Sequence, residues 1–279
     1  MTVFHRLAKK LFFGRYQRPW HWPPGVDTDA WERVTIASGS GAKLAAIFGP
    51  AYEPAAGAVV LAHPMTVAAK GFWLKHGHAE LLRRHGFDVL AFDFNGFGES
   101  ESGNFDYPAD VLAAGEYLRQ RQPSTGVAAV GASFGAGYVL CALANASHPF
   151  SCAVLEAAFP SLPYFWRRYP LPSAMLRLSQ LFYPRLERDL RPMLAAAKLE
   201  RSPRVLLIHG EADTISPVAV GEELRTVMRQ SAHPELWVVP GAEHSLAVTA
   251  VPEQYAERVI AFLCSGSAKD LDASHGRTS

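Results

Sequence analysis

Short apolar segments and longer amphipathic segments alternate along most of the chain. Segments with the length and composition of strands occur at 31–37, 43–48, 58–62, 87–92, 127–130, 152–155, 204–208 and 236–239. Segments with apolar residues at helical spacing occur at 72–84, 109–121, 136–146, 218–229 and 254–263. Because strands and helices alternate from residue 58 onward, the pattern predicts an α/β fold with a mostly parallel, doubly wound sheet of about eight strands.

The same pattern divides the chain into a core and three appended parts. We expect the core at residues 31–159 and 202–264, preceded by a basic segment with a linker at 1–30. Residues 160–201 follow the sixth predicted strand, are rich in Pro, Leu and aromatic residues, and far exceed a usual connection in length. They are predicted to form a helical cap over the strand ends, and the small polar residues 265–279 a disordered tail.

The N-terminal segment is basic and amphipathic. No acidic residue precedes Asp27, and Phe4, Leu7, Leu11 and neighbouring apolar residues fall on one helical face. One interpretation is an interfacial helix that makes a weak contact with an anionic membrane. The other is a terminal helix packed on its own domain, which the shortness of the segment favours.

Composition narrows the class of protein. The 279 residues are 49% hydrophobic with a formal charge of +1, enough for a large core but without a basic field for nucleic acid. Cys141, Cys152 and Cys264 are far apart and match neither a disulfide framework nor a zinc site, which favours a reducing compartment. The chain shows no secretory signal and no apolar run of about 20 residues. It is therefore expected in the cytoplasm, with at most a peripheral membrane contact.

A serine between two glycines follows one of the predicted central strands. The stretch Gly131-Ala132-Ser133-Phe134-Gly135 comes directly after the apolar residues 127–130 and before a predicted helix. A strand that turns at once into a helix needs small neighbours and exposes its central side chain at the sheet edge, which indicates a nucleophile elbow. The alternative is that Ser133 only caps the helix.

Two later loops supply the groups that a serine nucleophile needs. Asp213 follows strand 204–208 and His244 follows strand 236–239, so the three residues come in the order Ser, Asp, His. We predict that His244 is the base and that Asp213 orients it. Asp93 and Glu156 also end strands and are rival acids, whereas His209 is expected to fix its own loop.

Acyl transfer also needs donors for the oxyanion. One is predicted to be the backbone N–H of Phe134, directly after the nucleophile. The second should come from the loop after strand 58–62, where Pro64 has no N–H and Met65 is the next residue. Candidate residues for the substrate pocket are His63, Phe165, Trp166 and Phe182.

Two other kinds of site find little support. Gly96-x-Gly98 lacks the third glycine of a dinucleotide motif, and no phosphate-binding G-x-x-x-x-G-K-[ST] sequence occurs. Histidines at 63, 76, 78 and 85 suggest a metal cluster, but no H-E-x-x-H motif or cysteine pair accompanies them. A solvated helix face explains these histidines, and no metal is predicted.

With these motifs the chain resembles the α/β-hydrolase superfamily over roughly residues 34–263. The resemblance rests on Gly131–Gly135, on His209-Gly210-Glu211-Ala212-Asp213-Thr214-Ile215-Ser216-Pro217 and on Gly241-Ala242-Glu243-His244. The stretch from Asp93 to Ser100 is similar to the family's segment after the fourth strand. The stretch from Leu155 to Leu162 resembles the bud-emergence-related, single-domain branch. That branch usually has His-Gly after the third strand, where this chain has His63-Pro64.

The resemblance implies a serine hydrolase of carboxylic esters or thioesters, sometimes of amides, without a metal or organic cofactor. The aromatic cap indicates that the partner is a small-molecule ester with an apolar group. An acyltransferase, or an amidase or peptidase, would use the same three residues. The alternative of a different class is a non-catalytic scaffold that binds a ligand or partner.

Overall fold

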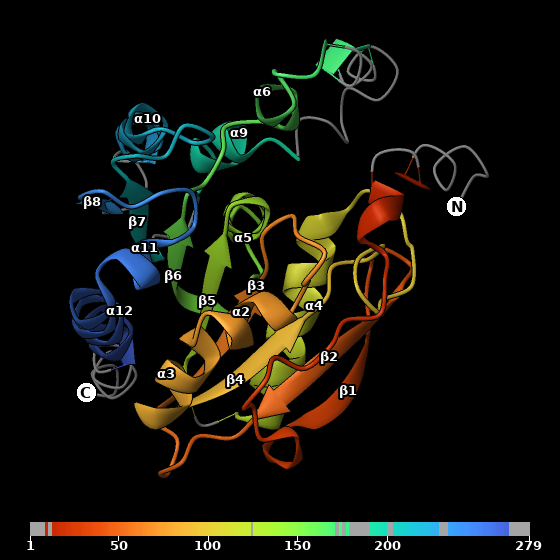
Figure 1. Cartoon of the computed structure of the whole chain (residues 1–279), viewed down its shortest axis with the longest axis vertical. Helices are drawn as coiled ribbons and strands as arrows, with labels where there is room; N and C mark the ends of the chain where they lie inside the picture. The colour runs from red at the N-terminus through yellow and green to blue at the C-terminus, as the bar shows by residue number, and fades with distance from the viewer. Residues whose placement is uncertain are drawn as a thin grey trace, which may run out of the picture.

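An eight-stranded sheet forms the centre of the molecule, with strand order β1-β2-β4-β3-β5-β6-β7-β8 (Figure 1). The computed structural model describes residues 9–10, 13–123, 125–170, 173–174, 177–178, 190–199, 203–228 and 234–267. The strands are β1 (Glu32–Ala37), β2 (Lys43–Gly49), β3 (Gly57–Ala62), β4 (Phe87–Phe92), β5 (Val127–Ala132), β6 (Phe150–Glu156), β7 (Arg204–Gly210) and β8 (Pro234–Val239). The predicted fold class is confirmed.

The order of the strands reverses beside β3. β4 pairs with one side of β3 and β5 with the other. The six neighbouring strands β4, β3, β5, β6, β7 and β8 are parallel. Only β2 runs in the opposite direction: it pairs antiparallel with β4 and with β1, and with β1 it forms the predicted hairpin at the edge. Ligand sites in open α/β sheets lie outside the carboxyl ends of strands at such a reversal. The loops that follow β3 and β5 therefore meet where a site is expected.

Helices cover both faces of the sheet (Figure 1). One face packs against α4 (Tyr107–Arg121), α5 (Phe134–Leu143), α9 (Pro192–Ala196) and α10 (Val218–Met228). The other packs against α2 (Gly71–Lys75), α3 (His78–Arg84), α11 (Ala247–Ala250) and α12 (Pro252–Ser267). Two short 3-10 helices, η1 (Gly14–Tyr16) and η2 (Thr28–Ala30), precede β1.

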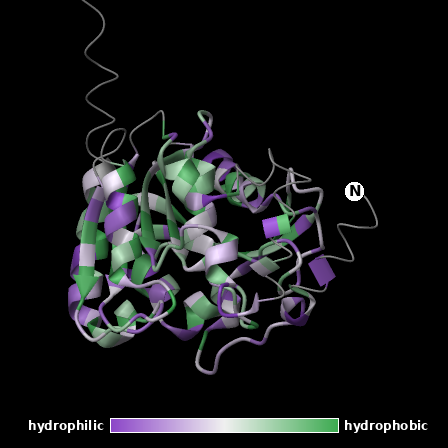
Figure 2. Ribbon diagram, turned by 90° about the horizontal axis from the view of Figure 1, so that it is seen from above, coloured by the Kyte–Doolittle hydropathy of each residue, from purple (hydrophilic) through white to green (hydrophobic). Residues whose placement is uncertain are grey.

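The apolar strands of the sequence pattern are buried on both faces. Along β3, Val60 faces the core of α4 and α5, whereas Val59 and Leu61 face the core of α3 and α12. Every residue of β3, β4 and β5 is buried, which explains why these strands read as continuous apolar runs rather than as alternating ones. In Figure 2 apolar residues follow the strands through the middle of the molecule, and polar residues lie on the surrounding helices.

Two predicted helices have other bounds in the structure. The segment expected as one helix at 72–84 is two helices, because Gly77 adopts φ +78° and ends α2 before α3 begins. A left-handed residue interrupts the helical hydrogen bonds, and glycine adopts this conformation without a steric penalty. The helix expected at 136–146 begins already at Phe134, directly after the serine, and ends at Leu143.

The appended parts are only partly described. Between β6 and β7 the structure shows α6 (Leu162–Phe165) and α9, while residues 179–189, including Phe182, lie outside the described residues. At the N-terminus, residues 1–8 and 11–12, with most of the predicted amphipathic helix, also lie outside them. Phe13 and Tyr16 are buried against Phe97. None of the described helices combines the length and apolar character needed to cross a bilayer.

Candidate active site

The predicted elbow is a sharp turn between β5 and α5. Ser133 has φ +49°, a conformation that costs a non-glycine residue free energy and is typical of functional sites. The glycines on either side are needed for space. A Cβ at Gly131 would lie 2.7 Å from the backbone of Ala136, and a Cβ at Gly135 would lie 1.9 Å from the carbonyl oxygen of Ala62. The second contact also shows that the start of α5 packs directly on the end of β3.

Ser133, His244 and Asp213 meet in one chain of hydrogen bonds. Ser133 Oγ lies 2.7 Å from His244 Nε2, and His244 Nδ1 lies 2.7 Å from Asp213 Oδ2. A carboxylate only accepts hydrogen bonds, so Nδ1–H donates to Asp213 and Nε2 is left to accept from the serine hydroxyl. The three strands that precede these residues, β5, β7 and β8, are parallel, so their carboxyl ends share one edge of the sheet.

Asp213 is held in its ionised form by its surroundings. Its side chain is fully buried, and its second oxygen, Oδ1, accepts from the backbone N–H of Ile215 and of Ser216, both at 2.8 Å. Burial opposes ionisation of the carboxyl, but the hydrogen bond and charge of His244 and the two N–H groups outweigh it, so the pKa of Asp213 is lowered. A buried, ionised carboxylate beside Nδ1 fixes the orientation and tautomer of the imidazole.

Of the three residues only His244, the predicted base, is open to solvent. The side chain of His244 is 19% exposed, whereas Ser133 and Asp213 are buried. The loop that carries His244 passes close to β7, where a Cβ at Gly210 would lie 2.2 Å from the carbonyl oxygen of Ala242. Chemically, this arrangement can take a proton from the serine hydroxyl and return it to a leaving group.

The two predicted oxyanion donors lie on the two loops that pack together here. Phe134 begins α5, so its backbone N–H points out of the helix N-terminus. In the described part of the chain, neither this N–H nor that of Met65 donates a hydrogen bond to the protein. Their joint action on a substrate stays a prediction.

The rival acids hold other groups. Asp93 is fully buried and pairs with Lys70 Nζ at 2.6 Å, and Oδ1 and Oδ2 also accept from the backbone N–H of Lys70 and Glu99. The carboxyl of Glu156 accepts from the backbone N–H of Ala247 at 2.9 Å. Neither carboxyl replaces Asp213 at His244 Nδ1.

Three of the described histidines other than His244 are buried, and the interpretation of a solvated helix face is wrong for His78. His78 is 2% exposed, and burial lowers its pKa to about 3. His63 has no exposed surface, its Nδ1 bonds to Pro64 O and its Nε2 accepts from Phe94 N–H; its place in a substrate pocket stays a prediction. His209 is also buried, and its Nδ1 bonds to Ser216 O at 3.2 Å within the loop after β7. The described residues contain no group of three or more potential metal ligands.

The described part of the cap is tied to the loop of Asp213. Phe165 is half-buried and packs on Phe159, and Trp166 is buried beside it. The next residue, Arg167, donates to the carbonyl oxygen of Ile215, and Arg168 donates to that of Thr214. The cap therefore contacts the segment that positions the acid.

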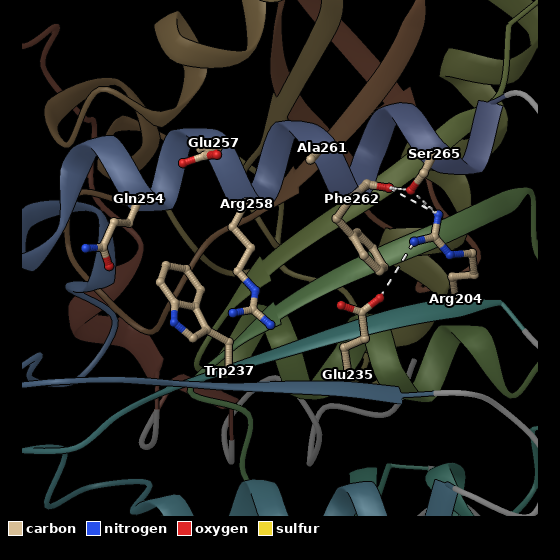
Figure 3. Close-up of a pocket in the computed structure, with 9 residues that line it drawn as sticks. All are labelled: Arg204, Glu235, Trp237, Gln254, Glu257, Arg258, Ala261, Phe262 and Ser265. Carbon is tan, nitrogen blue, oxygen red and sulfur yellow. Dashed lines mark hydrogen bonds and ion pairs between the residues drawn. The ribbon is translucent and has the colours of Figure 1, made fainter.

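A separate open groove of about 520 Å³ lies between α12 and the strands β7 and β8 (Figure 3). Arg204 spans it, with hydrogen bonds to Ser265 and Phe262 O and an ion pair with Glu235. The guanidinium of Arg258 lies over the ring of Trp237. Arg204 and Glu235 stand near the amino ends of their strands, so this groove is no extension of the triad.

Sequence reasoning missed the groups that pack next to the three candidate residues and support them. Tyr255 comes from α12, far along the chain, and its hydroxyl donates to Glu156. The sequence indicated Glu156 only as a rival acid. A buried acid at the end of a central strand is the signal that pointed to it, but its partners depend on how α12 packs.

Comparison with known proteins agrees with this fold. Residues 58–187 match the family model described as alpha/beta hydrolase fold. Human protein ABHD12B is 28% identical over 184 residues, which is 60% of this chain; the chain spans about half the length of this relative. The esterase Pf2001 of Pyrococcus furiosus superimposes with a TM-score of 0.71 at 21% identity, covering 88% of this chain and 96% of the esterase. An alpha-beta hydrolase of Vibrio vulnificus superimposes with a TM-score of 0.70 at 14% identity, covering 94% of each chain.

These matches, together with the order of the strands and the turn at Ser133, show that the chain has the α/β-hydrolase fold and is similar to members of that superfamily.

Proposed function

We propose that this protein is a serine hydrolase that cleaves a carboxylic ester or thioester through an acyl-enzyme intermediate. The observation that carries the proposal is the chain of two 2.7 Å hydrogen bonds from Ser133 through His244 to Asp213. Similarity to the superfamily supports hydrolase chemistry in general, and the triad geometry supports serine as the nucleophile.

In the proposed reaction, Ser133 Oγ attacks the carbonyl carbon of the ester while His244 Nε2 takes the hydroxyl proton. The negative charge on the carbonyl oxygen is met by the N–H of Phe134 and, we propose, by that of Met65. The imidazolium then gives its proton to the leaving alcohol or thiol, and the acyl group stays on Ser133. A water molecule, deprotonated by His244, attacks the acyl carbon; the bond to Ser133 Oγ breaks, His244 returns the proton to Oγ, and the acid is released.

An apolar acyl or alcohol group fits the described part of the cap. Phe165 and Trp166 lie close to the segment that follows β6, next to the triad strands. The proposal that they contact substrate can be tested with p-nitrophenyl esters of increasing acyl length. In the wild type kcat/KM should rise with acyl length, and Phe165→Ala should lower kcat/KM. Aminoacyl arylamides in the same assay distinguish an esterase from an amidase or peptidase.

A fluorophosphonate probe tests the nucleophile directly. We expect the wild-type protein to be labelled, Ser133→Ala to be unlabelled, and Ser151→Ala, a matched control at the amino end of β6, to be labelled like wild type. His244→Ala should lower kcat by several orders of magnitude, because the triad acts as a unit. A folded wild-type protein that is neither labelled nor active would favour the non-catalytic scaffold.

A further inference from the structure

Glu156 lies directly behind the candidate active site. It ends β6, where it stands opposite Ala132 of β5 and Ile208 of β7, and it is only 3% exposed. Its backbone oxygen accepts from Ser133 N–H at 2.8 Å, and its carboxyl Oε1 accepts from Ala247 N–H at 2.9 Å. Glu156 thus contacts both the turn at Ser133 and the start of α11, which follows the loop that carries His244.

The backbone beside this residue is held in unusual conformations. Ala157, the next residue, has φ +53°, and Ser245, next to His244, has φ +57°. Such conformations persist in residues other than glycine only where the surroundings hold them. The hydrogen bond from Ala247 to Glu156 joins these two loops and therefore restrains the position of His244.

The groups around the Glu156 carboxyl set its ionisation. Burial and, to a smaller extent, the charge of Asp213 raise the pKa of Glu156 to about 7, although the Ala247 N–H, the charge of His244 and the Tyr255 hydroxyl oppose the rise. Tyr255 reaches the carboxyl from α12 and is itself buried. Near neutral pH the carboxyl therefore exchanges between a neutral form and a charged form close to the triad.

We propose that Glu156 is a positioning residue of the hydrolytic triad. Its carboxyl anchors the histidine loop through Ala247, and in its ionised form it adds negative charge that stabilises the imidazolium formed on His244. The inference rests on the proposed function and deepens it. Glu156 does not act as the triad acid, because Asp213 occupies His244 Nδ1.

The decisive variant is Glu156→Gln, which keeps a hydrogen-bond acceptor for Ala247 N–H but cannot ionise. The readout is kcat/KM for a p-nitrophenyl ester between pH 5.5 and 9. At pH 5.5 the side chain of residue 156 is neutral in both proteins, so wild type and variant should differ by less than about twofold. At pH 8.5 we expect the variant to be about tenfold slower in kcat/KM, mainly through kcat, because a nearby charge of this kind acts on the transition state.

Two further variants separate charge from structure. Asp88→Asn neutralises a buried carboxyl at the amino end of β4, on the opposite side of the sheet, and should leave the pH profile unchanged. Tyr255→Phe removes a donor to the Glu156 carboxylate and should shift the Glu156-dependent rise of kcat/KM to a higher pH than in wild type. This second effect can be measured even if Glu156→Gln does not fold.

The outcomes distinguish the two proposals. If the wild type is active and the ratio of its kcat/KM to that of Glu156→Gln is constant across the pH range, the positioning role is overturned. A merely structural effect does not depend on pH. A pH profile of Tyr255→Phe that matches the wild-type profile overturns that role as well. A folded wild type that is neither labelled by the fluorophosphonate nor active overturns the proposed function, and the inference with it.

Discussion

Buried, neutral His78 should make the stability of this protein depend on pH. The ring packs edge-to-face on Trp73, with ring centres 4.9 Å apart, and on Tyr255, with ring centres 5.4 Å apart. Neither of its nitrogens has a hydrogen-bond partner among the described residues. Protonation would place an unpaired charge in this apolar contact, and burial accordingly lowers the pKa of His78 from 6.5 to about 3.

The sign and size of the effect follow from proton linkage. Below pH 6.5 the unfolded chain takes up a proton at His78, whereas the folded protein does not until the pH approaches 3. The contribution to stability is therefore complete above pH 6.5 and is lost as the pH falls. One pH unit corresponds to about 1.4 kcal/mol, so roughly 2 kcal/mol is lost by pH 5. The size of this loss is set by the pKa of His78 in the unfolded chain, because the pKa of His78 in the folded protein lies well below 5.

The variant His78→Leu removes this proton-binding site with a side chain of similar volume. Urea unfolding at pH 8, 7, 6 and 5 gives the free energy of unfolding of both proteins. Between pH 8 and pH 5 the wild type should lose about 2 kcal/mol more than His78→Leu. The exposed His85→Leu is the control and should follow the wild type. A difference between wild type and His78→Leu that does not change with pH would refute the reasoning.

Two further substitutions test the framework of the site. Lys70→Met leaves the buried carboxylate of Asp93 without its cation and should lower the free energy of unfolding by about 3–5 kcal/mol, against less than about 1 kcal/mol for the exposed Arg84→Met, both measured in urea. Gly135→Ala should abolish fluorophosphonate labelling, because its methyl group would lie 1.9 Å from Ala62 O; normal labelling with an unchanged Tm would contradict this account of the elbow.

The elements and the candidate triad could be predicted because their signals are local. The strands β3, β4 and β5 are buried on both faces, so their apolar character is visible in any short window of sequence. The glycines beside Ser133 are required by contacts with Ala136 and Ala62. Asp213 and His244 each follow a strand, and parallel neighbouring strands bring such loops to a common edge.

The burial of histidines was not predicted, because its signal is not local. His78 was interpreted as part of a solvated helix face, yet α12 covers it and brings Tyr255 against its ring. His63 is likewise buried, and Phe94 and Pro64 are the partners of its two nitrogens. Burial of a polar side chain depends on which distant element packs over it, and periodicity does not report that.

By itself the sequence determined the alternation of strands and helices, the turn at Ser133 and the chain order of the three candidate residues, because each depends on neighbours within a few positions. Only the tertiary structure decided which carboxyl meets His244. Asp93, Glu156 and Asp213 all end strands, and the choice among them follows from strand order, since Asp213 follows β7, which pairs with the strand that leads to His244. The structure likewise brought Tyr255 from α12 to Glu156, because packing between elements far apart in the chain places side chains that no local pattern relates.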